Sequence, residues 1–149
     1  MFVDSSIVSL NLDDNELASL DSATLRPLER TLRSLRVARN RAASLAVAAD
    51  ALRGFTLRDL VLASSRLRDL AFLENLASVE VLDVGGNPLG VIRLSWSSGL
   101  ALSCQEARLA AMNLTSVADA QLSSFRSARR LDLSTNSIAG TIQRSAAET

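Results

Sequence analysis

Pairs of apolar residues two positions apart recur along the chain at intervals of about 25 residues. The pairs are Leu10 and Leu12, Leu35 and Val37, Leu60 and Leu62, Leu82 and Val84, and Leu131 and Leu133. Apolar residues at every second position are typical of a strand with one buried face. Because the chain between two pairs is too short for a long helix, we expect strands stacked in parallel, each followed by a return arc.

Six segments align on this pattern, and most carry an asparagine shortly after the strand. They read IVSLNLDDNEL (7–17), LRSLRVARNRA (32–42), LRDLVLASSRL (57–67), VEVLDVGGNPL (79–89), CQEARLAAMNL (104–114) and ARRLDLSTNSI (128–138). The positions equivalent to the asparagine are Asn15, Asn40, Ser65, Asn87, Met112 and Asn136, at spacings of 25, 25, 22, 25 and 24 residues. All six segments resemble the LxxLxLxxNxL consensus of leucine-rich-repeat proteins.

The resemblance implies one domain over residues 1–149, an α/β solenoid. It would be a segment of a horseshoe, with six short parallel strands on the concave face and irregular or short-helical arcs on the convex face. The implied repeats are 7–31, 32–56, 57–78, 79–103, 104–127 and 128–149. The ends lack the polar caps of such solenoids, so we expect a fragment of a longer chain or end-to-end self-association.

The arcs carry apolar residues of their own, which we expect to point into a shared core. They are Leu20, Leu25, Leu28, Leu45, Leu52, Phe55, Leu70, Leu73, Leu76, Ile92, Leu100, Leu102, Val117, Leu122 and Phe125. No single segment holds enough of them for a core of its own. Stability is therefore expected to come from the stacking of neighbouring segments.

The asparagine after each strand has a mechanical role in this interpretation. Where a strand turns into its arc, backbone groups lose their ladder partners, and a side-chain amide can satisfy them. Asn15, Asn40, Asn87 and Asn136 are expected to form such a ladder. Ser65 can do part of this through its hydroxyl, whereas Met112 cannot, so the fifth segment is expected to be locally looser.

The outward strand residues form the surface where solenoids of this kind usually bind partners. We expect a protein partner to contact Arg36, Asp59, Val61, Val81, Asp83, Arg108 and Asp132. Val61 and Val81 would supply the apolar centre. Alternatively, Arg108 pairs laterally with Asp83 and Asp132, and Glu106 with Arg130, on a merely solvated face. The chain would then be a structural spacer in a larger receptor or adaptor, with the ligand bound elsewhere.

Composition removes several other functions. The 16 basic residues, all arginine, balance 16 acidic ones, which argues against a nucleic-acid partner bound through bulk charge. The chain has no histidine and one cysteine, Cys104, so we expect no zinc or other metal site, no cofactor and no enzymatic activity. The longest uncharged stretch spans only twelve residues, 94–105, so we expect no membrane insertion by this chain.

A few single residues carry narrower expectations. We interpret Cys104 as a small core residue and Trp96 as a side chain packed against its neighbours. The adjacent carboxylates of Asp13 and Asp14 are expected to be a solvated acidic pair. Asn113 begins an Asn-Leu-Thr glycosylation sequon, which has meaning only in a secreted chain. The segments resemble those of extracellular Toll-type recognition proteins, which implies an extracellular or cell-surface location as part of a longer chain.

Overall fold

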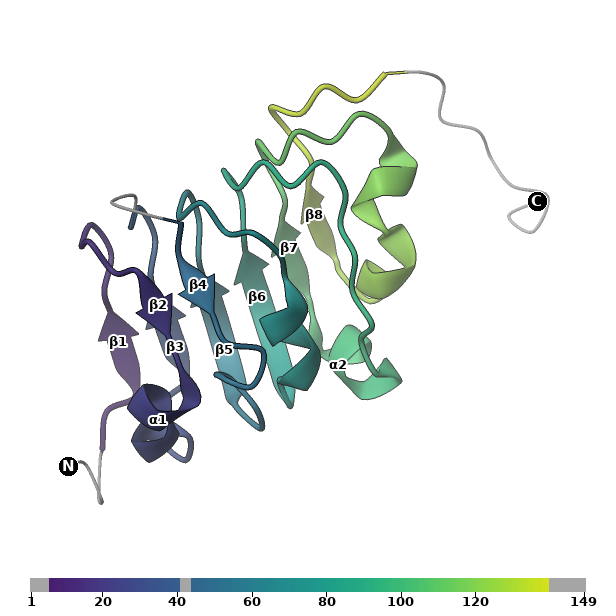
Figure 1. Ribbon diagram of the computed structural model, residues 1–149. Coiled ribbons are helices and arrows are strands. Elements are labelled where there is room, and N and C mark those ends of the chain that lie inside the picture. The colour runs from purple at the N-terminus through teal and green to yellow at the C-terminus, as the bar shows by residue number, and fades with distance from the viewer. Residues whose placement is uncertain (1–5, 41–43, 140–149) are drawn as a thin grey trace.

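The computed structural model describes residues 6–40 and 44–139, which contain a six-stranded parallel sheet. Its strands, in their order across the sheet, are β1 (Ser9–Asn11), β3 (Ser34–Arg36), β5 (Thr56–Val61), β6 (Ser78–Asp83), β7 (Glu106–Arg108) and β8 (Arg130–Asp132). Each strand lies beside the next one of this set along the chain (Figure 1). The prediction of parallel strands joined by return arcs is therefore confirmed.

The register of the sheet agrees with the alignment of the six segments. Cα partners across the sheet include, in one row, Leu10, Leu35, Leu60, Leu82, Ala107 and Leu131. The four central members of this row are fully buried, whereas Leu10 and Leu131, at the two edges, are half-buried. An edge strand has a neighbour on one side only, which accounts for the difference.

The arcs lie on one side of the sheet and contain only short elements (Figure 1). They are β2 (Ser19–Leu20), which pairs with β4 (Ala46–Val47), the α-helices α1 (Ser22–Leu25) and α2 (Ser98–Ser103), and the 3₁₀ helices η1 (Arg26–Leu28), η2 (Ala71–Asn75), η3 (Val117–Ala120) and η4 (Leu122–Phe125). A side-chain oxygen caps each α-helix: Asp21 accepts from the Thr24 N–H at 2.8 Å, and Ser97 accepts from the Leu100 N–H at 3.2 Å. Over the described ranges, no helix has the length and apolar character to cross a membrane.

Twelve of the expected arc residues are buried behind the sheet; Val117 is only half-buried and lies outside the core cluster, and two others are clear exceptions. Leu102 is 55% exposed and Leu122 is 44% exposed, so the expectation that they point inward is wrong. In α2 the side chains advance by about 100° per residue, so a helix that buries Leu100 and Ala101 turns Leu102 outward. Beside the exposed Leu122, the half-buried Gln121 side chain points toward the preceding arc and bonds to its backbone.

The Gln121 amide is held on both sides by one residue of that arc. Its Nε2 donates to the Leu94 carbonyl at 2.7 Å, and its Oε1 accepts from the Leu94 N–H at 2.8 Å. Gln121 has a φ of 52°, a left-handed conformation that directs the chain into η4. Gln121 thus joins the two arcs, next to the position where Leu122 was expected to point inward.

Candidate interaction surface

The face of the sheet opposite the arcs, here called the open face, carries the residues expected to bind a partner. Side chains alternate between the two faces of a strand, so this face presents the neighbours of the buried row. In the register of the sheet they form two columns: Asn11, Arg36, Val61, Asp83, Arg108 and Asp132; and Ser9, Ser34, Asp59, Val81, Glu106 and Arg130. All seven residues predicted for the partner surface therefore lie on one face.

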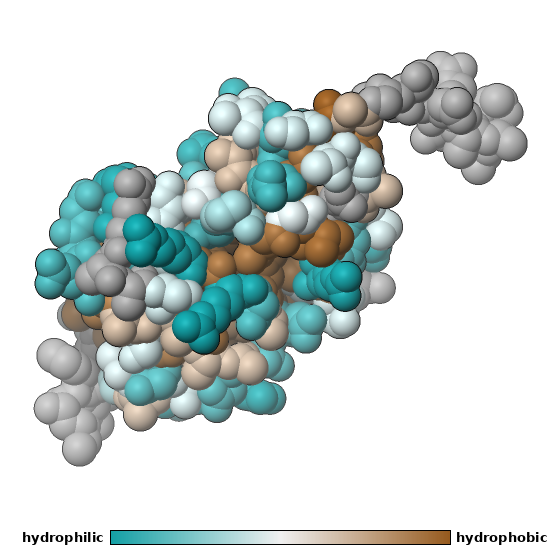
Figure 2. All heavy atoms as spheres, turned by 45° about the horizontal axis from the view of Figure 1, so that its top comes forward, coloured by the Kyte–Doolittle hydropathy of each residue, from teal (hydrophilic) through white to brown (hydrophobic). Residues whose placement is uncertain are grey.

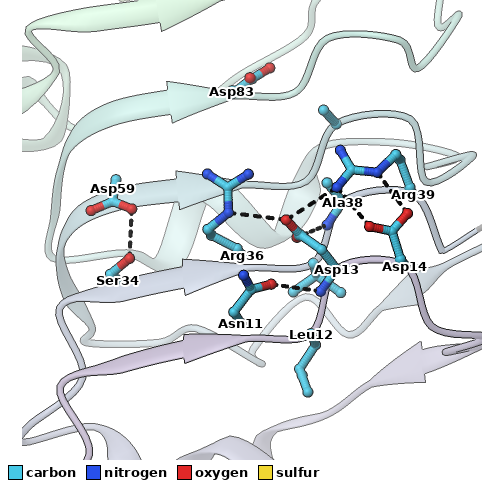
Figure 3. A network of polar contacts seen from close by, with 12 residues as sticks. Asn11, Leu12, Asp13, Asp14, Ser34, Arg36, Ala38, Arg39, Asp59 and Asp83 are labelled. Carbon is cyan, nitrogen blue, oxygen red and sulfur yellow. Dashed lines mark hydrogen bonds and ion pairs between the residues drawn. The ribbon is translucent and has the colours of Figure 1, made fainter.

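An ionic network occupies the β1 end of the open face (Figure 3). Asp13 Oδ2 lies 3.1 Å from Arg36 Nε and 3.5 Å from Arg39 Nη2, and Asp13 Oδ1 accepts from the Ala38 N–H at 2.8 Å. Asp14 accepts two bonds from Arg39, at 2.7 and 2.8 Å. This bidentate contact raises the pKa of Arg39 above its ordinary value. The Asp13 side chain is only 9% exposed, so its three contacts hold the turn after β1 against the next strand.

This network was missed by the sequence analysis, which took Asp13 and Asp14 for a solvated acidic pair. The signal was present in the spacing of the segments: a shift of 25 residues places Asp13 beside Ala38 and Asp14 beside Arg39. Because both carboxylates are engaged by arginine or by a backbone N–H, they bind the next segment rather than form an acid–base pair.

The centre of the open face is more polar than expected. Asp59 accepts a short bond, 2.6 Å, from the Ser34 hydroxyl, and Asp83 accepts from the Gly85 N–H at 3.0 Å. Val81 is half-buried, but Val61 is only 6% exposed. The expectation that Val61 and Val81 together supply an apolar centre is therefore corrected: only Val81 offers an appreciable surface.

Toward β8, a single arginine links the acidic residues. Arg108 Nε lies 2.6 Å from Glu106 Oε2 on its own strand, and its Nη1 lies 4.0 Å from Asp83 Oδ2. Asp132 instead accepts from the Ser134 N–H at 2.9 Å, and its hydrogen bonds to Ser134 lower its pKa. The Arg108 side chain is 51% exposed and is thus available to a partner.

Behind the strand ends, asparagine side chains tie each segment to the one before it. Asn87 is fully buried, and its Oδ1 accepts from the N–H groups of Ser65 and Leu67 at 3.1 and 3.0 Å. Its Nδ2 donates to Leu62 of the preceding segment at 3.0 Å and to the carbonyls of its own turn, Val84 and Gly85. These five contacts join two neighbouring turns into one network.

Asn40 and Asn136 repeat the arrangement, whereas Asn15 does not. Asn40 Nδ2 donates to Leu12, and Asn136 Nδ2 donates to Leu109, in each case a carbonyl of the preceding segment. Asn15 is exposed and bonds only to carbonyls of its own turn. The ladder thus runs in one direction: Asn40, Asn87 and Asn136 each bond backward along the chain.

The two positions without asparagine behave differently. Ser65 is fully buried and its hydroxyl donates to the Val37 carbonyl of the preceding segment at 2.7 Å. Met112 is also fully buried, but a thioether has no N–H to donate. In the ladder pattern, the residue at position 112 would accept from the Leu89 N–H. That N–H instead donates to Asn87 O at 2.8 Å, within its own turn.

The remaining singled-out residues lie away from the open face. Cys104 is buried, and burial raises the pKa of its thiol to about 11, so the thiol is a core group and not a nucleophile. Trp96 is half-buried and meets Phe125 edge to face, with ring centroids 5.4 Å apart. Asn113 is exposed, with a φ of 61°. Within the described residues, no group of three or more His, Cys, Asp or Glu could hold a metal ion.

Between the third and fourth arcs lies a shallow hollow of about 300 Å³. Leu70, Ala71, Leu89 and Val91 line it, together with charges of both signs: Arg68, Asp69, Glu74 and Arg93. Figure 2 shows apolar residues gathered among hydrophilic ones on one face of the molecule. Because its charges are mixed, the hollow favours no particular ligand.

Comparison with protein families, curated proteins and solved structures gives no match to the chain. The function is therefore inferred from the fold and from the geometry of the open face.

Proposed function

We propose that this chain is a leucine-rich-repeat solenoid, a horseshoe segment that binds a protein partner on its open, concave face without catalysis. The observation that supports it most directly is the asparagine ladder. Asn40, Asn87 and Asn136 occupy the consensus position and bond to the preceding turn in the same way. The row of buried residues at the consensus leucine positions supports the same proposal.

On the proposed binding face, two arginines are the strongest candidates for partner contacts. The Arg36 and Arg108 side chains are 41% and 51% exposed, and each is already oriented by a neighbouring carboxylate. An oriented guanidinium loses less side-chain entropy when it binds, and it retains N–H donors for a partner carboxylate or carbonyl. Asp59, Val81, Asp83 and Asp132 would complete the surface.

The test compares two double variants of equal charge change. Peptides selected from a displayed library on the native chain are titrated against Arg36→Glu/Arg108→Glu and against the control Arg53→Glu/Arg126→Glu, whose residues are exposed in the arcs. Loss of two charged hydrogen-bonding groups predicts binding weaker by roughly 10-fold or more for the first variant, and unchanged for the control. Equal binding to both variants would contradict the proposal.

The alternative function is a structural spacer within a larger receptor or adaptor. A spacer predicts that no selected peptide depends on the open face, although both double variants remain folded. A melting curve for each variant separates this outcome from simple loss of structure. Glycosylation at Asn113, read by mass spectrometry of the native protein, would favour the extracellular location implied by the resemblance.

A further inference from the structure

The one-directional ladder leaves unmatched groups at the two ends of the sheet. At the first end, Asn15 Nδ2 donates to Leu12 and Asp13, at 3.1 and 3.2 Å. Asn136 makes the same pair of bonds to Leu133 and Ser134, at 2.9 and 3.2 Å. Asn15 is thus held in the ladder geometry, but no described residue supplies the preceding turn that Asn136 has.

The last described segment presents the backbone groups to which the asparagine of a following segment would bond. Asn136 Oδ1 accepts from the N–H groups of Met112 and Leu114 of the segment before it. The equivalent N–H groups one segment later are those of Asn136 and Ile138, and within residues 44–139 no acceptor faces them. The Leu133 carbonyl corresponds to that of Leu109, which accepts from Asn136 Nδ2.

The strand edges match in the same register. After β7, the N–H groups of Leu109 and Ala111 donate to the carbonyls of Asp132 and Ser134, at 2.8 and 3.1 Å. The equivalent donors after β8 belong to Leu133 and Thr135. On β1, the backbone of Leu12 bonds toward β3, so the carbonyls of its neighbours Asn11 and Asp13 point away from the sheet. These carbonyls are the acceptors that Leu133 and Thr135 need.

Apolar surface accompanies both edges. Ile7 and Val8, before β1, are 37% and 52% exposed. Leu131 and Leu133, in and after β8, are only partly buried, although their equivalents in the central segments are buried, and Ile138 is also only partly buried. An open strand edge with apolar neighbours is a template for pairing with another chain.

We propose that a second copy of this chain docks head to tail, with β8 of one copy beside β1 of the next. Continuing the register places Asp132 opposite Asn11 and Arg130 opposite Ser9, which brings no like charges together. Asn15 of the second copy then accepts from the Asn136 and Ile138 N–H groups of the first. Since the two contacting surfaces differ, the contact repeats and builds an open series or a ring. It uses the sheet edges and leaves the open face free, so it does not depend on the proposed function.

The test measures the mass of the full chain by sedimentation velocity over a dilution series. Species larger than two chains are expected to grow with concentration. Asn15→Ala, an exposed substitution, is expected to weaken association roughly 10-fold or more because two N–H groups lose their acceptor. Arg53→Ala, in an arc remote from both edges, is the control and is expected to associate like the native chain.

A charge exchange between Asn11 and Asp132 tests the proposed register. Asn11→Asp opposes a carboxylate to Asp132 and is expected to weaken association about 2- to 5-fold. The double variant Asn11→Asp/Asp132→Asn removes that repulsion at unchanged composition and is expected to restore association. Both new side chains keep an oxygen for the local bonds to the Asp13 and Ser134 N–H groups.

Three outcomes would overturn the proposal. A single chain at every concentration would mean that something other than a second copy, such as a further repeat, covers these edges. A species that stops at two chains would indicate a symmetric contact. Failure of the charge exchange to restore association would refute the register. Peptide binding by the Arg36 and Arg108 variants is measured separately, so failure here leaves the proposed function untouched.

Discussion

Replacing Asn87 with alanine is expected to remove a large part of the stability of this fold. Its side chain is fully buried, and its Oδ1 is the acceptor for the N–H groups of Ser65 and Leu67, which are themselves buried. A buried donor left without a partner costs about 1–3 kcal/mol, so the two together cost about 2–6 kcal/mol. A domain of ordinary stability has only about 5–15 kcal/mol in total.

The ladder itself provides the matched control. Asn15→Ala makes the same chemical change at the equivalent position, but Asn15 is exposed and bonds only within its own turn. Water replaces those bonds, so its cost is expected to stay below about 1 kcal/mol. Urea unfolding followed by circular dichroism, at concentrations where the chain is single, measures both. Equal midpoints for the two variants would refute the ladder as a source of stability.

Two further predictions use single residues. Gly86 has a φ of 72°, and a Cβ there would overlap Ser64 Oγ, whereas a Cβ at Gly90, with a φ of 82°, would lie in open space. Gly86→Ala should therefore lower the urea midpoint more than Gly90→Ala does. Equal losses in the two variants would contradict this prediction. The Cys104 thiol, with a pKa of about 11 folded and 9.0 ordinarily, loses its proton first in the unfolded chain, so stability should fall as pH rises from 9 toward 11. The melting temperature of Cys104→Ala should not fall in this way over the same pH range. If the melting temperatures of the native chain and the variant fell in parallel, the thiol would not be the cause.

The strands were predictable because the sheet imposes its period on the sequence. Alternating apolar residues indicate one buried face, and similar spacings, of 25 and 22 residues, align Leu35 with Leu60 and Leu60 with Leu82. The arcs impose no such period. Leu102 points outward because a short helix capped by Ser97 sets its rotation, and no local pattern in the sequence predicts that rotation.

The residues of the open face were predictable from the sequence, but their exposure was not. Register alone places Arg36, Val61 and Asp83 in one column. How much of Val61 remains accessible depends on how the strands and side chains around it pack, which is a property of the assembled sheet. The Asp14–Arg39 pair could have been predicted, since it follows from the same spacing of 25 residues that aligned the strands.

The direction of the asparagine ladder also imposes an order in time. The Ser65 turn receives its acceptor from Asn87 and the Met112 turn from Asn136, 22 and 24 residues further along the chain. At ribosomal rates of about 5–20 residues per second, each turn waits roughly 1–5 seconds for the asparagine that completes it. During synthesis, the Ser65 and Met112 turns therefore stay hydrated until the asparagine that completes each of them has been made.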